Sequence, residues 1–301
     1  MRDRSGAPVL FAASLTPLRA DGAIDHELLA RHARALVARG CEGVALFGTT
    51  GEGQAFSVEE RMAGLEALLA SGFPAERVIL GAGASALPDV VRLASHATRL
   101  GCAGVLLLPY FLFRDAREDG IFRFHAEVVE GVGDRRLRLL LYNLPSISGV
   151  VLAPRLIERL AAAYPDAIAG IKDSSADWRW TSTLLRRFPE LPVYIGAEPH
   201  LRRAVAAGAK GGICGLANLS PELLLRLLTV GDRAAQTMAE RLVELVLGHP
   251  VVPASKALQA EADHEPGWHR VRAPLLPLER AARERLLAGW AQLETAARRV
   301  A

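Results

Sequence analysis

Lysine is scarce in this chain of 301 residues. Of its 36 Lys and Arg residues only three are lysines, namely Lys172, Lys210 and Lys256. Arginine serves wherever a cation is needed only for solubility, but its guanidinium stays protonated in proteins and cannot attack a carbonyl as a free amine. The positions of the three lysines in the fold therefore bear on function.

Cysteine and metal-binding patterns are sparse too. Cys41, Cys102 and Cys214 lie far apart, in apolar or glycine-rich sequence and without a metal spacing, as is typical of reduced core residues in a cytoplasmic protein. The eight histidines show no ligand spacing. The glycine-rich segment 81–84 lacks the third glycine and the acidic residue of a dinucleotide site. We expect no metal and no cofactor.

Membrane and nucleic-acid signals are missing as well. No apolar run reaches the ~18 residues that a membrane-spanning helix needs, and residues 1–6 do not begin a signal peptide. The net charge is +3 and the pI about 9.0, but the arginines are scattered among Asp and Glu. Nucleic-acid binding requires a denser basic stripe. We expect a cytoplasmic protein with neither a membrane nor a nucleic acid as its partner.

Apolar, strand-like runs alternate with helical periodicity over most of the chain. Strands are predicted at residues 9–16, 43–49, 77–83, 104–110, 137–144, 168–173, 192–197 and 211–217. Helices are predicted at 25–39, 57–70, 86–100, 119–130, 153–163, 177–188, 199–207 and 220–229. This alternation predicts a parallel sheet covered by helices, in an α/β fold. An open, doubly wound sheet fits the alternation as well as a closed barrel does.

Internal similarity favours the closed barrel. The segment 38–44 resembles the segment 99–105, and 207–213 is a looser third copy. Each reads as a helix end stopped by glycine, a tight turn and a strand. The copies lie about two and about four strand–helix units apart, and regular spacing over eight units is typical of a (β/α)8 TIM barrel.

The alternation stops at about residue 230. We predict a catalytic barrel domain at residues 1–230 and a C-terminal helical extension packed on it at 231–301, with helices at 231–262 and 276–298. In such a barrel the chemistry lies at the carboxyl ends of the strands. Lys210 precedes the eighth strand and Lys256 falls in the extension, so that of the three lysines Lys172 alone lies at a strand end.

The second predicted strand ends in the sequence Gly-Thr-Thr-Gly-Glu-Gly, residues 48–53. The hydroxyls of Thr49 and Thr50, together with the backbone N–H groups of the turn, form a cradle suited to a carboxylate. An ordinary glycine-rich turn, in which the threonines cap the backbone, is the alternative interpretation.

Three further strand ends carry polar side chains. Tyr142 ends the fifth strand, Lys172 the sixth, and Glu198 follows Gly196 after the seventh. Partial burial at the mouth of a barrel activates a lysine as a Schiff-base nucleophile, although a lysine there can also extend into solvent. The tyrosine can act as a general acid or base, or can simply be a packed residue with a satisfied hydroxyl.

A lysine, a phenol and a carboxylate cradle at one barrel mouth indicate one kind of chemistry. The lysine condenses with a 2-oxo acid whose carboxylate is held by the threonines. The iminium then withdraws electrons, so that the carbanion at C3 is stabilised as an enamine, and the phenol moves protons to and from the reacting oxygen.

The motifs resemble one known family. Gly-Thr-Thr-Gly-Glu at 48–52, Tyr-Asn-Leu-Pro at 142–145 and Gly-Ile-Lys-Asp at 170–173 are similar, in order and spacing, to the dihydrodipicolinate synthase / N-acetylneuraminate lyase family of class I, Schiff-base aldolases. The resemblance covers nearly the whole chain, including the C-terminal segments 253–256 and 272–275. It implies a homotetramer, built as a dimer of dimers, that acts on a small 2-oxo acid without a cofactor.

The resemblance also implies residue roles. Lys172 would form the Schiff base, Tyr142 would shuttle protons, and Thr49 would hydrogen-bond toward that phenol. Thr50 would hold the substrate carboxylate. The remaining candidate substrate contacts are Gly48, Gly196, Glu198 and Ile213.

Two departures from the synthase pattern concern substrate choice. Synthases carry an arginine where this chain has Ile147, and a second tyrosine where it has Phe111. Sialic acid lyases present two acidic residues after the seventh strand, whereas here Glu198 stands alone, and a serine expected in the strand-eight loop is Gly215. We therefore expect an aldolase or dehydratase for a shorter 2-keto-3-deoxy acid, with pyruvate as product or donor. The alternatives are 4-hydroxy-tetrahydrodipicolinate synthesis from pyruvate and aspartate semialdehyde, and a non-catalytic 2-oxo acid binding protein.

Overall fold

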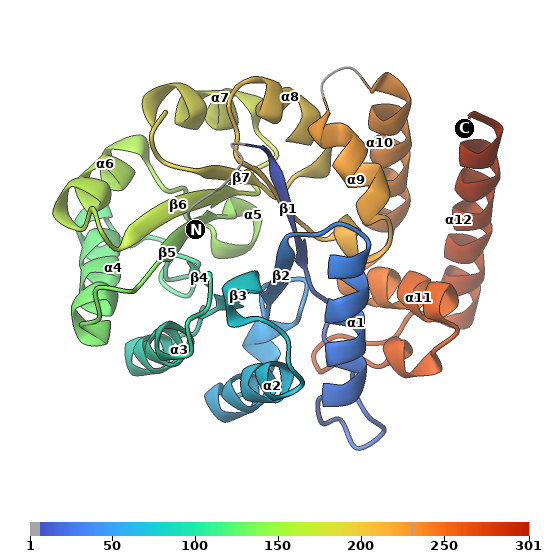
Figure 1. Cartoon of the computed structure of the whole chain (residues 1–301), viewed down its shortest axis with the longest axis horizontal. Coiled ribbons are helices and arrows are strands. Elements are labelled where there is room, and N and C mark those ends of the chain that lie inside the picture. The colour runs from blue at the N-terminus through green and yellow to red at the C-terminus, as the bar shows by residue number, and fades with distance from the viewer. Residues whose placement is uncertain (1–6, 230–231, 301) are drawn as a thin grey trace.

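Eight parallel strands close into a barrel in the computed structural model, which describes residues 7–229 and 232–300 (Figure 1). The strands run in chain order around the barrel, and β8 pairs with β1. Their bounds are β1 Val9–Ala13, β2 Gly43–Leu46, β3 Val78–Gly81, β4 Gly104–Leu107, β5 Leu139–Asn143, β6 Ile168–Asp173, β7 Val193–Ile195 and β8 Gly211–Cys214. The predicted (β/α)8 barrel is confirmed, and the open sheet is wrong.

Each strand is followed by a helix, and the helices surround the barrel (Figure 1). Their bounds are α1 His26–Ala38, α2 Val58–Ala70, α3 Leu87–Arg99, α4 Glu118–Val132, α6 Pro154–Ala163, α7 Trp178–Arg187, α8 Leu201–Ala206 and α9 Pro221–Leu228. A short helix that was not predicted, α5 Pro145–Ser148, follows β5. Single 3₁₀ turns are η1 Gly53–Ala55, η2 Ala75–Arg77, η3 Glu198–His200, η4 Leu216–Asn218 and η5 Pro266–His269. Most predicted strands extend too far at their carboxyl ends, because those residues already belong to the loops at the barrel mouth.

The alternation of side chains along β5 and β6 decides what faces the barrel interior. Leu141 and Ile171 are register partners that pack outward against the helical layer. Leu140 and Tyr142 belong to the separate cluster inside the barrel. Because successive side chains of a strand point to opposite faces, Lys172, the register partner of Tyr142, points inward as well.

The three glycines of the internal repeat have the conformation that their sequence context predicts. Gly40, Gly101 and Gly208 adopt φ values of 100°, 79° and 99°. Each follows a helix (α1, α3 or α8) and precedes a strand (β2, β4 or β8). A left-handed backbone is strained for residues with a Cβ atom, so glycine fits each of these helix ends.

The C-terminal segment forms three helices rather than the two predicted. They are α10 Arg233–Leu247, α11 Val251–Asp263 and α12 Arg280–Val300. The single helix predicted at 231–262 is wrong, because the helical conformation is interrupted between α10 and α11, from Gly248 to Pro250. Proline lacks the N–H that a helix interior needs. The predicted domain boundary between 230 and 231 lies outside the described residues. None of the helices in the described ranges is both long and apolar enough to cross a membrane.

Candidate active site

Lys172 and Tyr142 lie side by side at the carboxyl ends of β6 and β5. They are register partners, and the Lys172 Nζ atom lies 4.2 Å from the centre of the Tyr142 ring. Each residue is 4% exposed. An ammonium over the face of an aromatic ring is attracted by its quadrupole. The barrel therefore holds an amine and a phenol together in an environment that is largely shielded from solvent.

Gly196 leaves room for this lysine. A Cβ atom added at Gly196 would lie 3.0 Å from Lys172 Cε and 1.9 Å from Ser174 Oγ. A larger residue would displace both side chains. Gly196 thus shapes the space around the lysine, whereas its predicted contact with substrate stays a prediction.

A buried hydrogen-bond network stands directly behind the pair. Asn143 Nδ2 donates to Asp173 Oδ1 at 2.8 Å, and the Thr181 hydroxyl donates to Asp173 Oδ2 at 2.6 Å. The Leu152 N–H donates to Asn143 Oδ1 at 3.2 Å. The network joins the residues that follow Tyr142 and Lys172, and so fixes the ends of β5 and β6 relative to one another. We did not predict it, because the family motifs contain both residues but do not reveal the bond between them.

The turn after β2 is held rigidly by its backbone. The Thr16 hydroxyl donates to the Gly51 carbonyl at 2.7 Å, and the Glu52 N–H donates to the Thr49 carbonyl at 3.1 Å. A Cβ atom at Gly51 would lie 2.7 Å from the Ser14 carbonyl oxygen, so that only glycine fits there. This turn carries Thr49 and Thr50.

The turn adjoins free space at Gly48 and lies against Gly215. A Cβ atom at Gly48 would meet nothing within 4 Å, and one at Gly215 would lie 3.5 Å from Thr50 Oγ1. Thr49 Oγ1 is buried and has no hydrogen-bond partner among the described residues, so the bond expected toward the Tyr142 phenol is not formed. A buried hydroxyl without a partner is unfavourable.

Glu198 faces the same space from the start of η3. It is 9% exposed, and its Oε1 accepts a hydrogen bond from the Leu216 N–H at 3.0 Å. Burial raises the pKa of this carboxyl, while the backbone N–H groups and the charge of Lys172 oppose the rise. A Cβ atom at Gly215 would lie 3.9 Å from Glu198 Oε1, which places Gly215 between Glu198 and Thr50.

Ile213 lies on β8 and is fully buried in the cluster inside the barrel, which also contains Phe11 and Tyr194. Its side chain therefore belongs to the packed interior in this structure. The predicted contact of Ile213 with substrate stays a prediction.

The loop after β4 forms an aromatic rim. Tyr110 stacks on Phe113 at 5.2 Å between ring centres, and on Phe111 at 6.3 Å. Ile147, on α5, is 50% exposed and brings no charge. A Cβ atom at Gly149 would lie 2.6 Å from Arg114 Cδ, so the Arg114 side chain passes close to the end of α5.

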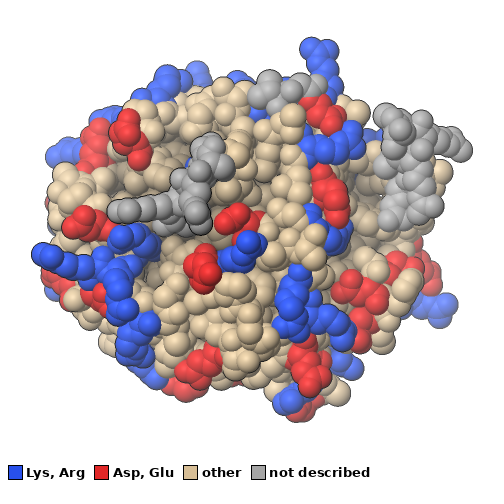
Figure 2. Space-filling model, in the orientation of Figure 1, with Lys and Arg blue, Asp and Glu red and all other residues tan. Residues whose placement is uncertain are grey.

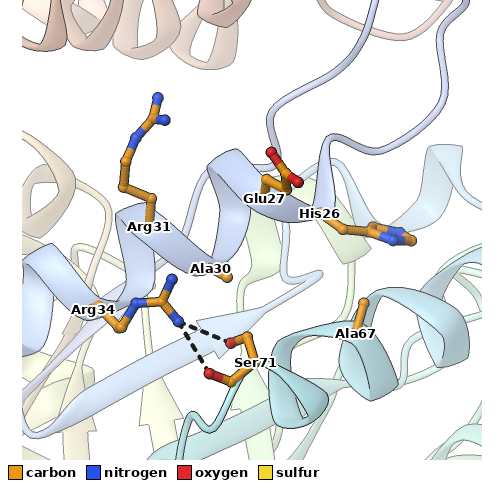
Figure 3. A pocket seen from close by; sticks show the side chains of 7 residues that line it. All are labelled: His26, Glu27, Ala30, Arg31, Arg34, Ala67 and Ser71. Carbon is orange, nitrogen blue, oxygen red and sulfur yellow. Dashed lines mark hydrogen bonds between the residues drawn. The ribbon is translucent and has the colours of Figure 1, made fainter.

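The surface away from the barrel mouth offers weaker candidates. A groove of about 400 Å³ lies between α1 and α2, where Arg34 donates to the carbonyl and hydroxyl oxygens of Ser71 (Figure 3). It is open, and it lies on the outer helical layer rather than at the strand ends. Basic and acidic residues are intermixed on the face seen in Figure 2. Within residues 7–229 and 232–300, no three His, Cys, Asp or Glu side chains are grouped so as to hold a metal ion.

The chain matches the model of the "Dihydrodipicolinate synthetase family" over residues 8–292. It is 34% identical over 293 residues to an "Uncharacterized DapA-like lyase" of Chloroflexus aurantiacus, which covers 93% of this chain and 97% of the relative.

Two solved structures are similar over nearly their whole length. The dihydrodipicolinate synthase of Agrobacterium tumefaciens superposes with a TM-score of 0.90 at 34% identity, covering 95% of this chain and 99% of that one. The KD(P)GA of T. tenax superposes with a TM-score of 0.85 at 26% identity, covering 96% and 99%.

Proposed function

Because the chain belongs to the dihydrodipicolinate synthetase family, we propose that it cleaves or dehydrates a short, hydroxylated 2-oxo acid through a Schiff base on Lys172. Family membership makes the chain an enzyme, a lyase with class I aldolase chemistry. A 2-keto-3-deoxy sugar acid is the proposed substrate class, with pyruvate as product or donor. The observation that carries the proposal is the buried pair of Lys172 and Tyr142.

The proposed reaction begins at the Lys172 amine. The neutral amine attacks the C2 carbonyl of the 2-oxo acid, a carbinolamine forms, and water leaves to give an iminium. In an aldol cleavage, the C4 hydroxyl loses its proton, the C3–C4 bond breaks and its electrons enter the iminium as an enamine. In a dehydration, a proton leaves C3 and the hydroxyl leaves with a proton as water. Tyr142 is the proposed group for transferring these protons, and the contact of its ring with the Lys172 amine supports this role.

The turn after β2 is the proposed site for the substrate carboxylate. Thr49 offers a buried hydroxyl without a partner, and the Thr50 hydroxyl lies against Gly215, 3.5 Å from where a Cβ atom there would be. Hydroxyls on a preformed turn bind an anion without reorganising. The carboxylate would thus be fixed on one side of the Lys172 amine.

Glu198 is the proposed contact for a substrate hydroxyl. Its carboxyl lies across Gly215 from Thr50, and the space left by the missing serine side chain at Gly215 adjoins both groups. Its raised pKa favours a carboxyl that is protonated more readily than an exposed one, and a protonated carboxyl can donate to a hydroxyl oxygen. Gly196 and Ile213 remain proposed as neighbours of the bound substrate.

The synthase reaction is the second candidate. The Agrobacterium tumefaciens structure, whose title names a dihydrodipicolinate synthase, is more similar in sequence than the T. tenax KD(P)GA. Ile147 and Phe111 weigh against it, since the two residues offer neither the charge nor the second phenol that synthases carry there. A non-catalytic binding protein is disfavoured because the amine, the phenol and both threonines are all in place.

A homotetramer in the cytoplasm is proposed as the setting of this activity. Four large apolar residues near the aromatic rim are strongly exposed in the single chain: Leu112, Phe113, Ile147 and Val151. Contiguous exposed apolar residues are typical of an association surface. All three cysteines are free thiols, as a reducing compartment would keep them. Small-molecule substrates are the proposed partners, rather than nucleic acid or membrane.

The experiment that tests the proposed function is reductive trapping. Incubation with pyruvate and borohydride should fix an adduct on Lys172, located by peptide mass spectrometry. Lys172→Arg should abolish it, because the guanidinium offers no free amine. The matched control is Lys210→Arg, which changes a lysine before β8 and should leave the adduct intact. Labelling at Lys210 or Lys256 in the parent would contradict the assignment. A turnover screen over 2-keto-3-deoxy acids then identifies the substrate.

A further inference from the structure

A buried ion pair joins the turn after β2 to the C-terminal helices. The Glu52 carboxylate pairs with Lys256 Nζ of α11, and the two side chains are 1% and 0% exposed. The second carboxylate oxygen of Glu52 accepts from the Arg272 N–H at 2.8 Å. Lys256 also donates to the Arg270 carbonyl at 2.7 Å. Neither charged side chain has a part in the proposed reaction.

Glu52 has an unusual backbone for its residue type. Its φ and ψ are 57° and 27°, in the left-handed region that residues other than glycine seldom adopt. Its N–H donates to the Thr49 carbonyl at 3.1 Å, and the Gly53 N–H donates to the Gly48 carbonyl at 3.1 Å. These two bonds close the turn that carries the threonines. The orientation of Glu52 therefore sets the shape of the turn.

A second contact holds the sequence that follows this turn. The Arg272 guanidinium donates to Glu60 at 2.6 Å and to the Ala55 carbonyl at 3.2 Å. It also lies 4.6 Å from the centre of the Phe56 ring. Arg272 thus contacts the chain from Glu52 to Glu60 at two points, through its backbone N–H at Glu52 and through its guanidinium at Ala55 and Glu60.

We propose that the Glu52–Lys256 pair positions the carboxylate-binding turn, so that the C-terminal helical segment controls the affinity for the 2-oxo acid. This inference rests on the proposed binding of the substrate carboxylate by Thr49 and Thr50. A buried ion pair is seldom more stabilising than an apolar pair of similar volume, and its better attested use is to fix one geometry. Here the geometry that it fixes is the left-handed residue that ends the Gly-Thr-Thr-Gly-Glu turn. Glu52 and Lys256 act through Thr49 and Thr50 and touch no reacting atom.

The double variant Glu52→Gln/Lys256→Met separates positioning from general stability. Glu52→Gln alone leaves a buried, unpaired ammonium and should lower the melting temperature, whereas the double variant removes both charges and should recover much of that loss. The pyruvate concentration for half-maximal borohydride trapping should nevertheless stay raised by about tenfold in the double variant, because the turn is no longer held. The trapping rate at saturating pyruvate should be unchanged, since Lys172 and Tyr142 are untouched.

Leu258→Ala is the matched control. Leu258 lies on the same helix, α11, and its apolar side chain is fully buried in the core. It should lower the melting temperature but leave the half-maximal pyruvate concentration as in the parent. An unchanged half-maximal concentration in the double variant, or an equal rise in Leu258→Ala, would overturn the positioning role.

Amide hydrogen exchange tests the inference without relying on pyruvate chemistry. The amides of residues 48–53 should exchange faster in the double variant than in the parent, while those of α11 keep their protection. If the parent formed no adduct with pyruvate, the proposed function would fail, and the exchange result would still decide this inference. Unchanged protection of the amides of residues 48–53 in the double variant would contradict the positioning role of the Glu52–Lys256 pair.

Discussion

Lys172 and Tyr142 are direct register partners on adjacent strands, with Lys172 Nζ 4.2 Å from the centre of the phenol ring. Neither loop motion nor a side-chain rearrangement is needed to bring them together, because the pairing of β5 with β6 does so. Catalytic groups carried on strands are held more precisely than those on loops. The relative position of these two side chains thus depends on the register of two strands.

Replacing Tyr142 with phenylalanine should separate proton transfer from packing. Tyr142→Phe keeps the ring beside Lys172 but removes the hydroxyl. A lost general acid or base typically slows the reaction roughly 10²–10⁴-fold. We expect kcat to fall by this factor, with a melting temperature close to that of the parent.

Tyr164→Phe is the control for the loss of a phenol. The Tyr164 hydroxyl donates to Glu130 at 2.6 Å on the outer helical layer, away from the strand ends. This variant should turn over like the parent. Parent-like kcat in Tyr142→Phe would mean that the Tyr142 phenol is a packing group and that another residue transfers the proton.

Removing the Asp173 carboxylate should destabilise the ends of β5 and β6. Asp173→Ala leaves the buried Asn143 Nδ2 donor without its acceptor, while the Thr181 hydroxyl keeps the Asp177 carbonyl as an acceptor at 3.1 Å. An orphaned buried donor costs about 1–3 kcal/mol. Urea unfolding should report a loss of unfolding free energy in this range or above, and borohydride trapping of pyruvate at Lys172 should slow.

Asp177→Ala is the comparison. It removes a helix cap on the exposed start of α7, and it should lower stability without slowing the trapping. Equal trapping rates in the two variants would contradict a role for Asp173 in placing Lys172.

Glu198 should make the stability of the protein depend on pH in a defined direction. Burial raises the pKa of this carboxyl above its ordinary value of 4.5. The folded protein then keeps the proton at pH values where the unfolded chain has lost it, so the free energy of unfolding falls as the pH rises above that value. Glu198→Gln removes this loss. The variant should be as stable as the parent near pH 4 and more stable at neutral pH, as measured by urea unfolding.

Glu222→Gln provides a control of opposite sign. Its hydrogen bond to Arg39 lowers the pKa of Glu222, so this carboxylate stabilises the fold above its ordinary pKa, and that contribution is lost on acidification. Equal stability of the Glu198→Gln variant and the parent at all pH values would contradict the buried state of Glu198.

For activity, Glu198→Gln should reduce kcat/KM for a hydroxylated 2-oxo acid and leave pyruvate trapping intact.

The barrel and its chemical groups could be predicted from the sequence because both depend on local signals. Strand and helix periods, glycine at Gly40, Gly101 and Gly208, and the short motifs around Thr49, Tyr142 and Lys172 are all readable within a few residues. The break of the C-terminal helix near Pro250 is an equally local signal, although the helix predicted at 231–262 runs through it.

The contacts that support the site could not be predicted in the same way. Glu52 and Lys256 lie more than two-thirds of the chain apart, and no spacing rule links them. The left-handed backbone of Glu52 is also invisible in sequence, because the residue type disfavours it. Likewise, the bond between Asn143 and Asp173 depends on strand register. Tertiary packing, and not local sequence, decides which of these residues come into contact.

The discrimination against aspartate semialdehyde should depend on the missing cation at position 147. Ile147 is 50% exposed and offers no partner to a second substrate's carboxylate. Loss of a charge-assisted hydrogen bond costs about 1.5–3 kcal/mol, or roughly 10–150-fold in binding. We expect kcat/KM for condensation of pyruvate with aspartate semialdehyde to be well below that for the preferred hydroxylated 2-oxo acid on the same preparation.

Ile147→Arg should raise the condensation rate within that range. Leu247→Arg, at an exposed apolar residue of α10, adds the same charge as a control and should not. The variant is not expected to reach synthase rates, because Phe111 still lacks the second phenol. If the parent already prefers the semialdehyde, the argument from Ile147 is wrong. Arg114, which lies against Gly149 at the end of α5, then becomes the cation to test, and Arg114→Ala should abolish the condensation.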